Sequence, residues 1–233
     1  MTTVLLVRHG RTSANAGGVL AGWTPGVALD ERGTKQAEAL AESLKDVPLS
    51  RLVTSPLQRC YETADIIAAQ NAFNPLIEPD ERLAECRYGS WTGKKLKKLV
   101  RDPLWRVVQE TPSAVHFPGK EAESLLNVSR RANEAVRYWV SITKPTRKSP
   151  SPVVLLVSHG DVIKAILADA LGMHLDMFQR IVVDPCSVSM IRYTQTRPLV
   201  LATNAVNVDF SFLKSKKPHS SHAQVGGGRG VRS

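Results

Sequence analysis

Apolar residues gather in two nearly identical runs that lie far apart in the chain. VLLVRHGR begins at Val4 and VLLVSHGD begins at Val154, and their first seven positions differ only at Arg8 and Ser158. Each run is continuously apolar rather than alternating, which is typical of a strand buried on both faces of a sheet. We therefore predict two buried strands, over residues 4–7 and 153–157.

Helical spacing of apolar residues fills the segments between these strands. In residues 29–44, alanines and leucines recur at helical intervals and Asp30 is placed to cap the first turn. Pro56 fits the first turn of a second helix, because a helix start does not need the N–H that proline lacks. We also expect helices over residues 119–142 and 161–171, a short strand over 51–55, and an antiparallel hairpin made by 186–194 and 197–204.

The order of these elements predicts the fold class. Strands that alternate with helices indicate a three-layer α/β/α sandwich with a mostly parallel central sheet, and residues 1–213 suit a single domain of this kind. Between about residues 86 and 120 the chain is basic and aromatic and its periodicity is weak. We interpret that stretch as a small cap insertion.

The net charge of +10 raises the question of a nucleic-acid partner. Half of the excess lies in the last twenty residues, which are rich in Gly and Ser and hold five Lys/Arg and no acid. We expect residues 214–233 to be a basic tail, disordered when free, and we do not expect nucleic acid as a partner. A second cluster, KKLKKLVR from Lys94, predicts one exposed helix that is either a solvated face or an anion-binding surface.

Cysteine usage and hydropathy bear on location. Cys60, Cys86 and Cys186 lack the spacing of a metal site or a disulfide framework, which favours a reducing cytoplasm. No apolar run approaches the roughly 20 residues that span a bilayer, and the first strand follows no basic leader. We therefore expect neither a membrane anchor nor a signal peptide.

Each apolar run ends in a His-Gly pair. Ligands bind beyond the carboxyl ends of the strands in such sheets, so we expect His9 and His159 on one rim, although either alone would also fit a structural role. Arg8 adjoins the first histidine, and Arg59 falls in the first turn of a helix, where free N–H groups attract anions. Two guanidiniums and two imidazoles around one point suit a tetrahedral dianion.

A metal is the other partner that two histidines suggest. The chain contains no HxH, HExxH or CxxC pattern, and Arg8 beside a dication would be repulsive. We therefore expect no metal and no cofactor.

The motifs around these positions resemble the histidine phosphatase superfamily, in its phosphoglycerate mutase-like branch. RHG followed by Thr12 and Asn15 matches the opening signature of that family, and SHG at residues 158–160 completes the set. The resemblance extends to about residue 205 and implies a phosphoglycerate mutase-like fold. The intervening matches are GW at 22–23, LDERG at 29–33, TSPLQRCYETA at 54–64, LAECRYGSWTG at 83–93 and PGKEAES near Gly119.

The resemblance also implies roles for particular residues. His9 would be the nucleophile, forming a phosphohistidine that water then cleaves. Arg8, Arg59 and His159 would hold and neutralise the phosphoryl oxygens, and Glu85 would protonate the leaving group. The other candidates for binding substrate or phosphate are Asn15, Gly22, Arg11, Tyr88 and Gly160.

Three functions stay open at this point. The first is a phosphomonoester hydrolase that releases inorganic phosphate from a small anionic metabolite. The second is a phosphoglycerate-type phosphomutase, and the third is a catalytically silent module that binds a phospho-ligand or nucleic acid. Mutases of the family carry a longer insert with paired arginines and a proline-rich segment, whereas this chain reads RDPLWRVVQETPSAVHFPGK there, which favours hydrolysis. Relatives are often dimers, so the resemblance allows a homodimer.

Overall fold

A six-stranded sheet forms the centre of the computed structural model, which describes residues 1–147 and 149–214. The strand order is β3-β2-β4-β1-β5-β6, with β3, β2, β4 and β1 parallel and β5 and β6 added as an antiparallel edge. The predicted hairpin is thus confirmed. The strands are β1 Thr2–Arg8, β2 Leu49–Thr54, β3 Ile77–Pro79, β4 Val153–Ser158, β5 Val188–Tyr193 and β6 Pro198–Ala205.

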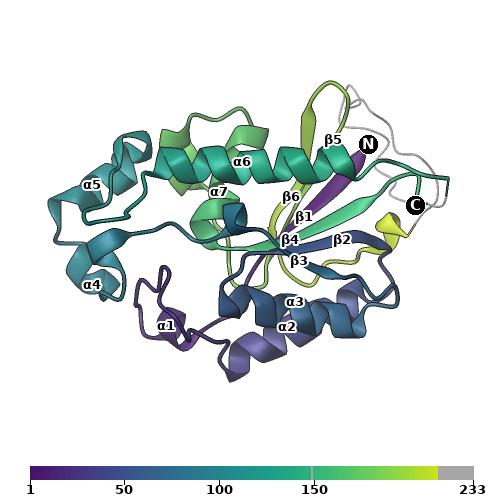
Figure 1. The fold of residues 1–233 in the computed structure, drawn as a ribbon, viewed down its shortest axis with the longest axis horizontal. Coiled ribbons are helices and arrows are strands. Elements are labelled where there is room, and N and C mark those ends of the chain that lie inside the picture. The colour runs from purple at the N-terminus through teal and green to yellow at the C-terminus, as the bar shows by residue number, and fades with distance from the viewer. Residues whose placement is uncertain (148, 215–233) are drawn as a thin grey trace.

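Helices cover both faces of the sheet (Figure 1). Helices α2 and α3 pack on one face and α6 and α7 on the other, which confirms the predicted sandwich. The helices are α1 Ser13–Ala16, α2 Glu31–Leu44, α3 Gln58–Gln70, α4 Leu96–Leu99, α5 Pro103–Glu110, α6 Leu125–Ile142 and α7 Gly160–Ala170. Short 3₁₀ turns lie at Glu81–Leu83, Gly89–Trp91, Pro112–Ala114, Leu175–Arg180 and Ser211–Leu213.

The two VLLV runs lie side by side in the sheet. Strands β1 and β4 are parallel and in register, so Val4 lies opposite Val154 and Arg8 lies opposite Ser158. Alternate residues of each strand enter the two hydrophobic clusters on opposite faces of the sheet. Both faces are therefore covered, which explains why neither run contains a polar position before its end.

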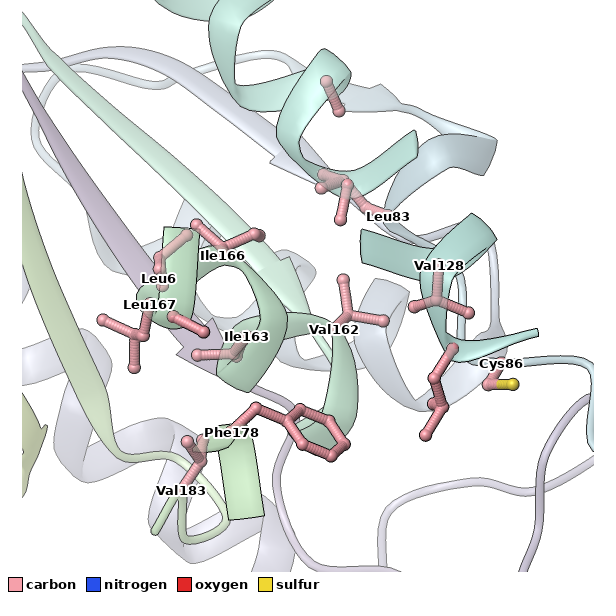
Figure 2. Close-up of a cluster of buried hydrophobic side chains, with 14 of the residues drawn as sticks. Leu6, Leu83, Cys86, Val128, Val162, Ile163, Ile166, Leu167, Phe178 and Val183 are labelled. Atoms are coloured by element: carbon pink, nitrogen blue, oxygen red, sulfur yellow. The ribbon is translucent and has the colours of Figure 1, made fainter. Parts of the chain in front are cut away.

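Helix α7 anchors the second histidine through a buried apolar face (Figure 2). Val162, Ile163 and Ile166 are fully buried and belong to one cluster with Leu6 of β1 and Phe178. Burial of each such side chain stabilises the fold by roughly 1.5–3 kcal/mol. This packing fixes the first turn of α7 relative to the end of β1.

Pro56 lies before α3 rather than in its first turn, contrary to the prediction. Leu57 is the N-cap residue with φ −73° and ψ 136°, and its N–H donates to Oγ of Ser55 at 3.3 Å. The Ser55 side chain holds this turn, so the helix begins only at Gln58. Arg59 nevertheless lies in the first turn, as expected.

The prediction of a helix from residue 119 was wrong in its first part, because α6 begins at Leu125. Ser124 caps the helix and accepts a hydrogen bond from the N–H of Asn127. The residues before it pair with the cap loop instead. The N–H of Glu123 donates to the carbonyl of Arg87 at 2.9 Å.

The predicted basic helix is shorter than KKLKKLVR, since α4 covers only Leu96–Leu99. Pro103 disfavours helical geometry at the preceding residue, and Asp102 is extended, with ψ 133°. Leu99 is buried while the lysines around it are exposed.

Two expectations concern the ends of the chain and the membrane. The predicted tail over 214–233 lies outside the described residues except for Lys214. Within the described part of the chain, no helix has both the length and the apolar composition needed to cross a bilayer.

Candidate active site

The strand pairing brings the two predicted histidines together. His9 follows β1 and His159 follows β4, and the N–H of His9 donates to the carbonyl of Ser158 at 3.0 Å. Both rings are buried, and their centroids are 5.2 Å apart at an interplanar angle of 62°. The repeated apolar runs therefore deliver two imidazoles to one point.

His9 is held in one tautomer. Its Nδ1 lies 2.7 Å from the carbonyl oxygen of Gly10, which can only accept, so Nδ1 carries the proton. Nε2 is then unprotonated, and Nε of Arg59 donates to it at 3.2 Å. Burial, followed by the charges of Arg59 and Arg8, holds the pKa of His9 well below its usual range. A neutral imidazole with a lone pair on Nε2 is a nucleophile.

Arg59 contacts three of the other predicted site residues. Besides its bond to His9, its Nη2 donates to the carbonyl of Gly22 at 2.9 Å and lies 3.2 Å from Nδ1 of His159. The guanidinium is buried and can only donate, so Nδ1 of His159 is the acceptor. Arg59 is thus a fixed cation next to the His9 ring.

His9, Arg8 and Arg59 line a cavity, whereas the fully buried His159 lies behind its wall and is not among the lining residues. Its Nε2 is 2.8 Å from Oγ of Ser55, and this nitrogen carries the proton because Nδ1 accepts from Arg59. Burial, followed by the positive charge of Arg59, lowers the pKa of His159 well below its usual range. Sequence reasoning missed Ser55, although its place at the end of β2, in TSPLQR, was a usable signal.

Arg8 lines the cavity from the end of β1. Its Nη1 donates to the carbonyl of Val183 at 2.6 Å, which fixes the side chain. Its Nε is buried and has no hydrogen-bond partner among the described residues. Gly160, also in the lining, begins α7, so free N–H groups of a helix start face the same space.

Glu85 reaches the site from the loop after β3. Its Oε2 lies 3.8 Å from Nδ1 of His159, and its Oε1 accepts from the N–H of Cys86 at 3.0 Å. Burial first, and then the negative charge of Asp161, raise the pKa of Glu85. The carboxyl can therefore hold a proton at a pH where an exposed glutamate would have lost it.

Tyr88 and Asp161 form the wall beside Glu85. The hydroxyl of Tyr88 donates to Oδ2 of Asp161 at 2.8 Å, and burial raises the pKa of the phenol well above its usual range. Sequence reasoning named Tyr88 but missed Asp161, which directly follows the SHG motif.

Of the remaining binding candidates, Asn15 and Gly22 line the cavity and Arg11 does not. Asn15 lines the cavity, and its Oδ1 accepts from the N–H and hydroxyl of Thr12. Gly22 also lines it. Arg11 does not, because its Nε pairs with Oδ2 of Asp30 at 2.9 Å. The Arg11 guanidinium thus forms an ion pair with the N-cap residue of α2 instead of facing the cavity.

The cavity has a volume of about 420 Å³. Its inner end holds the buried His9 and Arg59 and the half-buried Arg8, whereas Leu96 and Val182 line it and are exposed. Lys164 lies in the wall, where its Nζ donates to Oε1 of Gln179 at 3.0 Å. Sequence reasoning missed these outer residues, since nothing local in the sequence marks them as neighbours.

In the described part of the chain, no group of three or more His, Cys, Asp or Glu side chains is arranged to hold a metal ion.

Comparison with known proteins agrees with this fold. Residues 4–206 match the model of the histidine phosphatase superfamily (branch 1), and the chain belongs to that family.

Individual relatives carry different names. The chain is 32% identical to phosphoserine phosphatase 1 of Hydrogenobacter thermophilus over 212 residues, 88% of this chain and 92% of that protein. It is 29% identical to the probable phosphoglycerate mutase GpmB of Erwinia tasmaniensis, covering 84% of this chain and 87% of that protein. The solved structure of a mycobacterial glucosyl-3-phosphoglycerate phosphatase superposes with a TM-score of 0.76 at 26% identity, covering 87% of this chain and 98% of that one.

Proposed function

We propose that this protein is a phosphomonoester hydrolase that acts through a phosphohistidine on a small anionic phosphorylated metabolite. The observation that carries the proposal is the fixed tautomer of His9, whose unprotonated Nε2 lies 3.2 Å from Nε of Arg59. A neutral nucleophile and a buried cation at one point suit attack on a phosphoryl group.

The first half-reaction moves the phosphoryl group to the enzyme. Nε2 of His9 forms a bond to phosphorus while the bond from phosphorus to the ester oxygen breaks. Arg8 and Arg59 neutralise the phosphoryl oxygens, helped by the N–H groups at the start of α7. The proton of the Glu85 carboxyl passes to the leaving oxygen, so an alcohol departs.

The second half-reaction returns the enzyme to its first state. Water attacks phosphorus, the bond from phosphorus to Nε2 of His9 breaks, and inorganic phosphate leaves. Glu85, now a carboxylate, takes a proton from the attacking water. In this scheme His159 does not line the cavity. It accepts a hydrogen bond from Arg59 and lies close to Glu85, so it contacts both the cation and the acid of the reaction.

Hydrolysis is favoured over phosphoryl transfer between two hydroxyls of a phosphoglycerate. The cap stretch lacks the paired arginines of the mutase branch, and two of the relatives above are named phosphatases. A mutase must keep water from its phosphoenzyme.

The three cysteines are free, which supports a cytoplasmic location as part of the proposal.

A phosphate-release assay tests the proposal. Purified protein is incubated from acid to neutral pH with p-nitrophenyl phosphate and with a panel of phosphorylated metabolites that includes phosphoserine and 3-phosphoglycerate. We expect free phosphate from at least one ester and none from the His9→Ala variant. Interconversion of phosphoglycerates without phosphate release would assign the mutase reaction, and inactivity towards every compound would favour the silent binding module.

A further inference from the structure

Arg131 of helix α6 donates hydrogen bonds to the backbone of the loop that carries Glu85. Nη1 of Arg131 donates to the carbonyls of Arg82 and Ala84 at 2.8 and 2.7 Å, and its Nη2 donates to the carbonyl of Glu85 at 3.1 Å. The side chain is largely buried, with 17% of it exposed. Arg131 therefore holds the loop by its main chain on the side that precedes the acid.

Glu123 holds the other side of the same loop. It accepts from Nε and Nη2 of Arg131 at 2.8 and 2.9 Å, in a bidentate pair. Its Oε2 also accepts from the N–H of Arg87 at 2.9 Å, and its own N–H donates to the carbonyl of Arg87. The two side chains together bracket Glu85 between residues 82 and 87.

This bracket matters because the loop has little structure of its own. Residues 85–88 belong to no helix or strand. The carbonyl of Glu85 has one further donor, Nε1 of Trp23 at 2.6 Å, and the Arg87 guanidinium lies 3.7 Å from the centroid of the Trp23 ring. The placement of the Glu85 carboxyl thus depends on side chains from distant elements.

The geometry uses every donor that Arg131 has. A guanidinium carries five N–H groups, and the hydrogen bonds to the loop and to Glu123 account for all of them. Lysine has the same charge but no planar fork, so it cannot make this set of bonds. Loss of the fork should free the loop without removing the positive charge.

We propose that Arg131 and Glu123 are positioning residues for the general acid, and that they act on protonation of the leaving group rather than on phosphate binding. The proposal rests on the proposed function, in which Glu85 donates that proton. Neither residue lines the cavity, so neither touches the substrate.

Leaving-group dependence separates this role from a merely structural one. A nitrophenolate departs with little need of a proton, whereas an alkoxide needs the acid. For Arg131→Lys we expect the single-turnover rate of phosphoenzyme formation to fall about 100-fold with an alkyl phosphomonoester, as for other small misplacements of a catalytic group. With p-nitrophenyl phosphate the same rate should fall less than about threefold. Equal losses with both esters would overturn the proposal.

A matched control and a second variant keep the test decisive. Arg137→Lys, also on α6, removes only an exposed pair with Asp169 and should leave both rates unchanged. Glu123→Gln keeps the shape of its side chain, so it replaces Arg131→Lys if that variant does not fold. It should show the same selective loss for the alkyl ester.

Amide hydrogen exchange measures how firmly Arg131 and Glu123 hold the loop, and it requires no turnover. Amides of residues 84–88 should exchange faster in Arg131→Lys than in the unsubstituted protein and in Arg137→Lys, at a similar melting temperature. Unchanged exchange would overturn the positioning role even if activity falls. If the unsubstituted protein forms no phosphoenzyme from either ester, the proposed function is wrong, and so is the catalytic part of this inference. Hydrogen exchange would still show whether Arg131 and Glu123 hold the loop.

Discussion

The backbone of Gly10 lies against that of Gly33. A Cβ atom on Gly10 would lie 2.6 Å from the carbonyl oxygen of Gly33, and a Cβ on Gly33 would lie 2.0 Å from the carbonyl oxygen of Arg11. The first turn of α2 is thus pressed onto the segment that follows the proposed nucleophile. This contact gives the glycine after His9 a reason that the sequence alone did not suggest.

A methyl group at this contact should destabilise the fold. For Gly10→Ala we expect the free energy of unfolding to fall by about 1–3 kcal/mol, as for other overpacked sites. The melting temperature should drop by roughly 2–4 °C for each kcal/mol in a chain of this length. Thermal unfolding measures both quantities.

The glycine after the second histidine supplies the control. A Cβ on Gly160 would meet only Arg8, with its nearest atom, Nε, at 3.7 Å, an ordinary contact. Gly160→Ala should therefore lose no stability, because alanine is the better helix former. Equal losses in the two variants would show that the close approach of α2 is not what requires Gly10.

Local patterns predicted the part of the site that follows from the sheet. The continuous apolar runs placed His9 and His159 at the ends of two buried strands, and the register of β1 and β4 brings them together. Parallel pairing alone is enough to carry the residues after each run to one edge. That step needed no knowledge of side-chain contacts.

The side chains that hold the site from distant elements could not be predicted in this way. Arg131 and Lys164 owe their places to hydrogen bonds between elements that are distant in sequence. Arg11 was named as a binding candidate beside His9, but its pairing with Asp30 arises only when the chain returns to that point. Polar tertiary contacts leave no periodic signal in the chain.

Removal of the His9 imidazole should abolish turnover. His9→Ala should yield no phosphoenzyme in acid-quench experiments and no phosphate release above background. His116 is exposed, so His116→Ala is the matched control and should retain full activity. A phosphorylated His9→Ala protein would place the nucleophile elsewhere.

The pH dependence should reflect the lowered pKa of His9. Protonation removes the lone pair of Nε2, so activity is lost as pH falls through that pKa. Since burial and two arginines hold the pKa well below its usual range, kcat/KM should still be high at a pH where an exposed histidine would be mostly protonated. An acid limb centred near the ordinary histidine pKa of about 6.5 would contradict this.

Glu85→Gln should separate activity from stability. The variant cannot donate a proton, so turnover of alkyl esters should fall by about 100- to 10,000-fold and the alkaline limb of the pH profile should disappear. Because the folded-state pKa of Glu85 is raised, this carboxyl favours folding below its unfolded pKa, and that contribution is lost as pH rises through the folded pKa. The variant should therefore gain stability over the unsubstituted protein near pH 8 but not near pH 4. Melting temperatures at both pH values check the sign.

The basic stretch around α4 should attract anionic substrates if it is more than a solvated face. Lys97 and Lys98 are exposed on the short helix whose first residue, Leu96, lines the cavity. For the double variant Lys97→Glu with Lys98→Glu we expect kcat/KM for an anionic ester to fall about tenfold at low ionic strength. The loss should shrink as salt is added, because screening weakens the attraction.

Charge reversal elsewhere distinguishes local steering from net charge. Lys35 and Lys45 are exposed residues at α2, on the other side of the sheet from the cap, and each pairs with a glutamate of that helix. Reversing both changes the net charge by the same amount as reversing Lys97 and Lys98. If the position of α4 matters, only the α4 variant should lose kcat/KM, with kcat unchanged, since neither lysine touches the reacting atoms. Equal losses from the two double variants would assign the effect to the charge of the whole protein and leave α4 a solvated face.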